Sequence, residues 1–257
     1  MKPKTKGPSW AWTAGAFTVM VLVGVFQNLV AARLQGTPPM QFAEAVGKAL
    51  FTEELWKALG STLFRFSIGF SMALVAASIL GIAMGRVKRV EDFFSVGVNV
   101  LRPIPSAAII PFAMFIFAYG GISMKLFVII YGVFWPILLQ VWQGAKDIDP
   151  ILLATGKTLG KRRFKMFIQI IVPATLPSIM VGARVGLGVG LLLAVTTEIL
   201  IASDPGIGYL ILDYERSFKY APMVGAIILL GLVGWVLDFI FVKIERWCLP
   251  WHHGRNL

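Results

Sequence analysis

Among the ionised side chains inside otherwise apolar stretches of this sequence, four are candidates for a function: Arg102, Arg184, Glu198 and Asp238. A buried charge costs free energy unless it is paired or reaches water, so each of the four needs a partner or an aqueous path. An arginine that faces such a path could attract an anion. A carboxylate could line the path or pair with a cation on a neighbouring helix.

The residues that an enzyme would need are scarce. The two histidines, His252 and His253, are adjacent in a polar tail, and Cys248 is the single cysteine, so neither an internal disulfide nor a thiol metal cluster can form. No G-x-x-x-x-G-K-S/T loop, which would hold nucleotide phosphates, occurs in the chain. We therefore expect no catalytic residue, no metal and no cofactor in this chain, and we do not expect it to be an enzyme.

The composition sets the class of protein that must position these charges. Hydrophobic residues make up 57% of the 257 positions and charged residues only 14%, against roughly a quarter charged in soluble domains. Apolar stretches long enough to cross about 30 Å of hydrocarbon recur along the chain. We therefore expect an all-α polytopic membrane protein.

Hydropathy predicts about six transmembrane helices, at residues 12–32, 61–85, 93–118, 122–142, 170–202 and 222–242. If the N-terminus is cytoplasmic, 15 lysines and arginines fall in cytoplasmic segments and six on the other side. This bias predicts that both termini are cytoplasmic, and it explains the net charge of +11 without nucleic acid. The predicted organisation is a cytoplasmic tail at 1–11, one transmembrane domain at 12–242 with a cytoplasmic loop at 145–167, and a cytoplasmic tail at 243–257.

Two outer connections have amphipathic sequences. Residues 36–60 begin with a Pro-Pro break and then read as one helix lying at the membrane interface. Residues 203–222 hold a second, shorter amphipathic piece framed by Asp-Pro-Gly and Ala-Pro. Neither connection is typical of a separate soluble domain.

Span three contains Arg102 and, within nine residues, Pro103, Pro105 and Pro111. Prolines remove backbone donors, so this span should be broken or kinked. An arginine at the bilayer centre costs about 2.5–3.5 kcal/mol on insertion scales. Arg102 therefore either faces a translocation pathway beside Pro103 or reaches the phosphates of the cytoplasmic face.

Span five combines small residues with charges. Gly182, Gly186 and Gly190 recur every four residues and predict a smooth strip for close helix packing. Arg184, a charge in mid-span, is expected to face the bundle interior or an aqueous cavity. Glu198 lies about 21 Å further along the helix axis, where it could line an outer vestibule or pair with a neighbouring span. The candidates for the pathway are Arg102, Pro103, Arg184 and Glu198.

The polar loop at 147–167 interrupts the apolar chain. Asp149 and Pro150 form a strong helix start, a carboxylate cap followed by proline at the first position. The helix then offers three leucines, two glycines and a basic cluster: Leu152, Leu153, Leu159, Gly156, Gly160, Lys161, Arg162, Arg163 and Lys165. The residues alone leave two interpretations open. The loop is either held against anionic lipid headgroups or presents its leucine face to a groove on a soluble partner.

This segment resembles the cytoplasmic loop of the membrane subunits of binding-protein-dependent ABC importers. In that family a Glu-Ala-Ala helix, followed by a glycine and a Leu-Pro, docks in a cleft of the ATPase subunit and is called the coupling helix. Here Ala154, Thr155 and Gly156 stand at the Glu-Ala-Ala positions, with Gly160 at the glycine and Pro173 and Pro177 downstream. The signature acid is thus replaced by Ala154. Residues 101–149 and 182–211 and the ending "ERWCLPWHHG" are similar to the nitrate, sulfonate and taurine branch.

The resemblance implies a type I ABC importer permease fold, located as a multi-pass protein in the bacterial inner (plasma) membrane. It also implies transport by alternating access, driven by a separate ATPase that binds ATP and Mg. It implies two ATPase subunits, a second permease copy, most simply in a homodimer, and a periplasmic or lipid-anchored substrate-binding protein, besides the membrane lipids. The substrate would be a small, anionic nutrient resembling nitrate, a sulfonate or taurine. The coupling helix would comprise Pro150, Leu152, Leu153, Ala154, Thr155, Gly156, Leu159 and Gly160. The alternative is a secondary transporter or channel that needs no ATPase.

Overall fold

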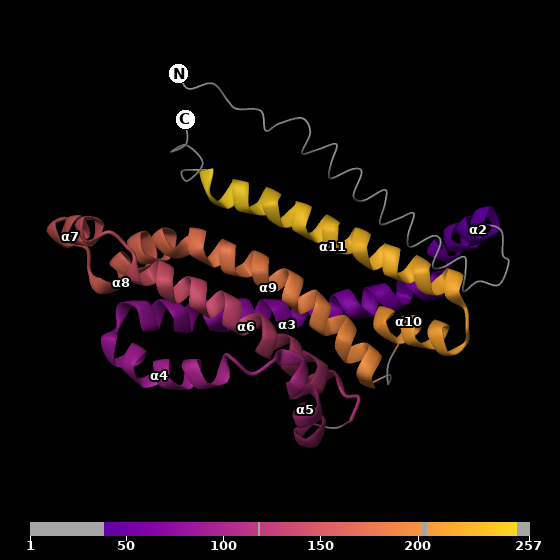
Figure 1. The fold of residues 1–257 in the computed structure, drawn as a ribbon. Helices are drawn as coiled ribbons and strands as arrows, with labels where there is room; N and C mark the ends of the chain where they lie inside the picture. The colour runs from indigo at the N-terminus through magenta and orange to yellow at the C-terminus, as the bar shows by residue number, and fades with distance from the viewer. Residues whose placement is uncertain (1–38, 118, 202–204, 251–257) are drawn as a thin grey trace, which may run out of the picture. The chain divides into compact units, whose positions relative to one another are not determined.

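The computed structural model describes residues 39–117, 119–201 and 205–250, which form helices with short connections and contain no strand (Figure 1). The α-helices are α2 (Pro39–Leu50), α3 (Glu53–Arg86), α4 (Lys88–Leu101), α5 (Ile110–Ile116), α6 (Ile122–Lys146), α7 (Pro150–Thr158), α8 (Arg163–Met166), α9 (Val172–Ile201), α10 (Ile207–Arg216) and α11 (Tyr220–Cys248). A 3₁₀ turn, η1 (Ser106–Ile109), precedes α5, and a π-helical turn, η2 (Phe167–Ile171), joins α8 to α9.

The chain divides into two compact units, Met1–Lys48 and Ala49–Leu257. In the first unit, the described residues form most of α2. The second unit holds the helices from α3 to α11 and all of the features discussed below.

Four helical stretches within the described residues are long and apolar enough to cross a membrane: Glu53–Arg86, Ile122–Lys146, Arg163–Ile201 and Tyr220–Cys248. Lys88–Leu101 and Ser106–Ile116 make a fifth candidate span if they are counted together, bent by 88°. These five stretches correspond to five of the six predicted spans. The predicted span at 12–32 lies outside the described residues.

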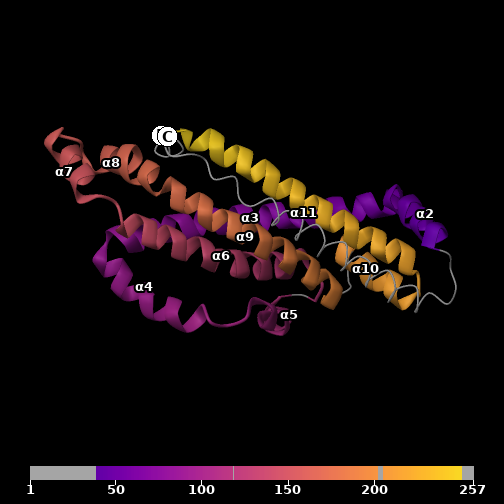
Figure 2. The same ribbon diagram turned by 45° about the horizontal axis from the view of Figure 1, so that its top comes forward.

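At the centre of the second unit, α6 packs between α3 and α9. It lies beside each of these two helices along most of its length (Figures 1 and 2). Val133, Ile137 and Val141 of α6 are fully buried there. Glycines allow the close approach: a Cβ on Gly81 of α3 would lie 2.8 Å from the Val141 Cβ, and a Cβ on Gly182 of α9 would lie 2.9 Å from the Ile137 Cα. In lipid, where the hydrophobic effect does not drive helices together, small residues allow the close van der Waals packing that does.

The break predicted for span three is confirmed. Helix α4 ends at Leu101, and the proline-rich segment from Arg102 to Pro105 leads through η1 into α5 at a steep angle. The Tyr131 hydroxyl of α6 donates a hydrogen bond of 2.8 Å to the Leu101 carbonyl. This bond satisfies one of the carbonyls that the end of a helix leaves without an internal partner.

The single interfacial helix predicted for residues 36–60 is wrong in its second half. Helix α2 ends at Leu50, and α3 begins at Glu53. The first turns of α3 bury Leu55, Ala58 and Leu59 against α10 and α11. Tertiary packing therefore extends the first candidate span of this unit toward its N-terminal end, whereas the amphipathic pattern alone suggested a separate surface helix.

The start of α9 is widened by a π turn next to a proline. The Val172 N–H donates to the Phe167 carbonyl, five residues back. Pro173 has no N–H, and in a regular α-helix its ring would press on the carbonyl four residues earlier. A π turn is one of the recognised ways for a helix to absorb such a defect.

Candidate functional site

Helix α7 is closed at both ends by local hydrogen bonds. The Asp149 carboxylate accepts a hydrogen bond of 2.8 Å from the Ile151 N–H, with Pro150 at the first helical position. At the other end, Lys161 N–H donates to the Gly156 carbonyl at 3.2 Å and Gly160 N–H donates to the Lys157 carbonyl at 2.9 Å. Gly160 has a φ of 66°. These are the two bonds and the left-handed residue of a Schellman motif, so α7 is a self-contained helix.

One glycine fixes α7 against the beginning of the long helix. Gly156 is buried, and a Cβ added to it would lie 2.4 Å from the Ile170 Cδ1. The opposite side of α7 is open: Ile151 is 72% exposed, Leu159 is 69% exposed, and Leu152 is also exposed. Ala154 and Thr155 are exposed as well, and Leu153 is half-buried. The helix therefore presents apolar side chains that nothing in this chain covers among the described residues.

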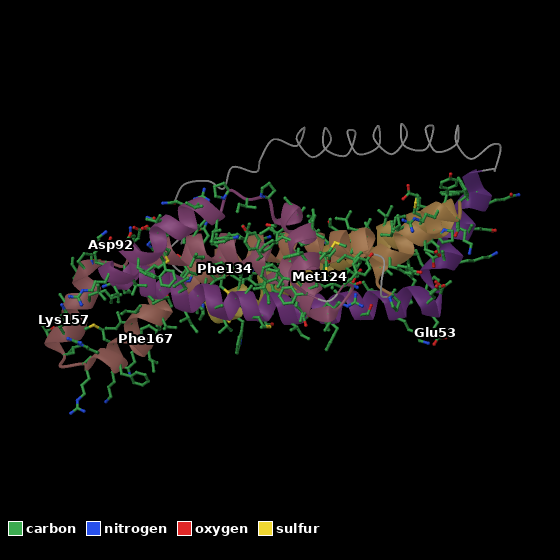
Figure 3. The ribbon with its side chains drawn as sticks, turned by 90° about the horizontal axis from the view of Figure 1, so that it is seen from below. Glu53, Asp92, Met124, Phe134, Lys157 and Phe167 are labelled. Carbon is green, nitrogen blue, oxygen red and sulfur yellow. The ribbon has the colours of Figure 1, made fainter. Side chains whose placement is uncertain are left out.

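The predicted set for α7 omitted two exposed apolar residues, Ile151 and Phe164, the second of which is 73% exposed at the start of α8. Helical spacing could have identified Ile151, because it shares a face with Thr155 and Leu159 at intervals of four residues. Exposed basic residues surround this surface, among them Lys157 and Arg163. Figure 3 shows Lys157 and Phe167 at one end of the second unit and Glu53 at the other.

Arg184 of α9 makes a two-bond ion pair with Asp238 of α11. Arg184 Nε lies 2.9 Å from Asp238 Oδ1, and Nη2 lies 3.0 Å from Oδ2. The two side chains are 50% and 45% exposed in this chain. Arg184 lies two residues from Gly182 and from Gly186, so it points away from the glycine strip that packs on α6.

Glu198 is enclosed by donors from two other helices. Its side chain is 1% exposed, and its Oε1 lies 2.5 Å from Nη1 of Arg65 on α3. The Thr62 hydroxyl, also on α3, lies 2.8 Å from Oε2, and the Gly208 N–H of α10 donates to Oε2 at 3.1 Å. Of the two roles considered for Glu198, the described geometry is that of an ion pair with a neighbouring helix. Hydropathy placed Arg65 within a span but offered no indication of its partner.

Arg102 and Pro103 lie at the break between α4 and η1, and both are exposed. Arg102 belongs to neither of the two ion pairs described above. The structure thus brings Glu198 together with Arg65, and Arg184 with Asp238, at separate places along α9. The strip of Gly182, Gly186 and Gly190 lies against α6, where added Cβ atoms would meet Ile137 and Val133 within about 3 Å.

No group of three or more histidine, cysteine, aspartate or glutamate side chains among the described residues could hold a metal ion. Cys248 is a free cysteine at the end of α11. His252 and His253 lie outside the described residues.

Residues 73–248 match the model of a protein family described as the inner membrane component of binding-protein-dependent transport systems. The match begins within α3 and extends to the end of α11, so it includes α7 and both ion-paired positions of α9.

Three similar proteins are permeases for sulfonates, taurine and nitrate. The chain is 31% identical over 245 residues to a provisionally named aliphatic sulfonates transport permease of Escherichia coli, covering 94% of this chain and 92% of that protein. It is 26% identical over 258 residues to the taurine transport system permease of Escherichia coli, covering 95% and 93%. It is 32% identical over 198 residues to a nitrate import permease of Synechocystis sp., covering 76% and 71%.

The fold has a counterpart among solved structures. A chain of the MetNI methionine ABC transporter, determined in an inward-facing conformation, superimposes with a TM-score of 0.61 at 18% identity, covering 76% of this chain and 96% of the other. At that identity the similarity establishes the arrangement of the helices but gives no information about the substrate.

Proposed function

This chain belongs to the family of inner membrane components of binding-protein-dependent transport systems, and we propose that it imports a small anion by alternating access. It is a multi-pass permease subunit of an ABC importer rather than an enzyme, and ATP hydrolysis resides in a separate subunit. The observation that carries the proposal furthest is α7, a capped helix with exposed apolar side chains.

We assign α7 the role of the coupling helix. Its exposed Leu152 and Leu159 are suited to a groove on a soluble subunit, because burying one leucine side chain contributes about 1.5–3 kcal/mol. Gly156 holds the helix against the first turns that lead into α9. A displacement of α7 by the ATPase would therefore reach α9, and through the close packing of α9 on α6 it would reach α3.

The proposed assembly has two ATPase subunits, which bind ATP and Mg, and two copies of this chain. A homodimer is the simpler arrangement, since one sequence then supplies both halves of the pathway. A periplasmic or lipid-anchored binding protein would deliver the substrate at the end of the second unit that carries α10, opposite to α7. The pathway residues proposed from the sequence, Arg102, Pro103, Arg184 and Glu198, would then differ in role: Arg184 and Glu198, each held in an ion pair, would fix helices rather than meet the substrate. Of these residues, we expect exposed Arg102, at the broken span, to meet the anion.

The substrate class rests on relatives named for sulfonates, taurine and nitrate. Each of those molecules carries an anionic group with several oxygens. We propose that this chain transports a nutrient of the same chemistry, with most of the selectivity in the binding protein.

The test is uptake into vesicles that contain this chain and its ATPase, supplied with the binding protein and a labelled sulfonate, taurine or nitrate. We expect uptake only when ATP, the ATPase and the binding protein are all present. Uptake driven by an ion gradient in vesicles that contain this chain alone would establish the alternative, a secondary transporter or channel, and would overturn the proposal.

A further inference from the structure

The carboxylate of Glu198 holds the N-terminal turn of a neighbouring helix. Helix α10 begins at Ile207, and the first N–H groups of a helix have no internal partner. Here the Gly208 N–H donates to Glu198 at 3.1 Å, and the Ile207 N–H donates to the Thr62 hydroxyl at 3.0 Å. Gly206, the residue at the cap position, has no side chain to do this work. Helices α9 and α3 therefore supply the cap that α10 lacks.

Two glycines make this approach possible. A Cβ on Gly206 would lie 2.3–2.4 Å from the carboxyl atoms of Glu198, and a Cβ on Gly208 would lie 2.4 Å from the Val195 carbonyl oxygen. The carbonyl of Pro205 also accepts a hydrogen bond of 2.5 Å from the Ser61 hydroxyl. The segment before α10 is thus fastened to α3 and α9 by polar contacts, several of which are buried.

The other end of α10 carries backbone strain at an exposed aromatic residue. Phe218 has a φ of 55° and is 76% exposed. It occupies the left-handed position of a Schellman motif, with Lys219 N–H bonded to the Tyr214 carbonyl at 2.8 Å and Phe218 N–H to the Glu215 carbonyl at 3.1 Å. Glycine or asparagine normally fills this position. A strained phenylalanine that the other described residues leave largely exposed is a candidate for a contact beyond them.

We propose that Glu198 is a positioning residue, which fixes α10 so that Phe218 contacts the soluble substrate-binding protein. The inference rests on the proposed function, because it takes the α10 end of the unit to be the outer face. The turn has the chemistry of an interface anchor: the exposed Phe218 ring packs edge-to-face against exposed Tyr220, at 6.3 Å between ring centroids. Glu215, Arg216 and Lys219 form a polar rim around it. Glu198 does not touch the substrate in this scheme.

The first experiment separates the charge of Glu198 from its role as an acceptor. Two neutral pairs of similar volume are compared in the complete transporter: Arg65→Met with Glu198→Gln, and Arg65→Met with Glu198→Met. Only the first keeps an oxygen for the Gly208 N–H. We expect the first pair to resemble the native chain. We expect the second to raise the half-saturating concentration of binding protein in the ATPase assay about tenfold, which is 1.4 kcal/mol at 25 °C. Basal ATPase activity should stay unchanged in both.

A glycine substitution perturbs the contact between Glu198 and the start of α10 without changing a charge. Gly206→Ala places a methyl group against the Glu198 carboxylate and should also raise the half-saturating concentration. Gly188→Ala on α9 is the matched control, because nothing lies within 4 Å of its Cβ position.

The decisive variant is Phe218→Gly, which relieves the strained φ. We expect the variant to melt no lower than the native protein and yet to need about tenfold more binding protein for half-saturation. Unchanged half-saturation in this variant would overturn the proposal. The proposal would also be overturned if both Arg65/Glu198 double variants were equally impaired and their substrate selectivity changed, since a pathway residue would behave in that way. Absence of ATPase stimulation by the binding protein in the native complex would instead refute the proposed function.

Discussion

Arg184 of α9 and Asp238 of α11 face one another through two hydrogen bonds, at 2.9 and 3.0 Å. The planar guanidinium matches the carboxylate with both bonds in register, which a lysine could not do. The pair joins α11 to the packed group of α3, α6 and α9. Because α11 buries few residues in this chain, the pair is a main polar link between α11 and α9 among the described residues.

The ion pair predicts a reciprocal rescue. Arg184→Asp and Asp238→Arg should each lower the amount of folded permease in the membrane several-fold, since each leaves two like charges facing one another. The double variant should recover most of the loss, because it restores an opposite-charge pair at the same place. The measurement is the yield of monodisperse protein after mild detergent extraction. Failure of the double variant to exceed either single one would show that the two residues act independently.

Helix α7 predicts where the ATPase binds. Leu152→Asp with Leu159→Asp should weaken ATPase binding more than tenfold, because each exposed leucine contributes about 1.5–3 kcal/mol when it is buried. Co-purification with the ATPase is the measurement. Val87→Asp, an exposed apolar residue in the turn between α3 and α4, is the matched control and should bind normally. Co-purification that survives the leucine changes would argue against the coupling assignment.

The sequence predicted the elements that depend on local chemistry. Five of the predicted spans have counterparts, because long apolar stretches leave few alternatives to a helix in lipid. The break after Arg102 followed from three prolines, and the start of α7 followed from Asp149 and Pro150. The family followed from the loop and its flanking stretches.

What the sequence did not predict is which distant residues meet. Arg65 and Glu198 are separated by 133 positions, and the residues between them contain nothing that fixes their pairing. For Asp238 the sequence left open a role in the pathway or in an ion pair, and its partner Arg184 was not identified. Such pairs depend on how helices rotate against one another, and that rotation is set by the glycine contacts on α6. A hydropathy profile does not resolve a helix face.

The glycine contacts predict that the effect of a valine substitution on stability depends strongly on which glycine of α9 is replaced. Gly182→Val should destabilise the permease by about 1–3 kcal/mol or more, because the added atoms meet the Ile137 backbone, which cannot move aside as a side chain can. Gly188→Val, on the same helix, meets open space and should be close to neutral. Thermal unfolding in detergent compares the two variants. Equal melting temperatures would contradict the packing assigned to this strip.

Gly156 predicts a compensating pair within the loop. Gly156→Ala supplies the alanine that the family pattern has at this position, but its methyl group would lie 2.4 Å from the Ile170 Cδ1. The single variant should therefore shift α7 and reduce ATP-driven uptake. Adding Ile170→Val removes the clashing carbon and should restore uptake, whereas Ile170→Val alone should have little effect, since such a change typically costs about 0.5–1.5 kcal/mol. A double variant no better than Gly156→Ala would exclude this contact as the cause.

Ala154 stands where the coupling helix of the family has a glutamate, so restoring that glutamate tests whether the ATPase can still bind it. The residue is exposed, so Ala154→Glu introduces no clash within α7. Within the helix the new carboxylate could pair only with Lys157, three residues on, and such pairs contribute about 0.2–0.5 kcal/mol. A charge-assisted hydrogen bond to the ATPase would contribute about 1.5–3 kcal/mol, at least tenfold in affinity. We expect the larger gain, measured as the ATPase concentration for half-maximal binding, with Ala154→Gln as the uncharged control. A gain confined to the melting temperature would mean that this ATPase offers no cation there and that leucine burial alone holds the two subunits together.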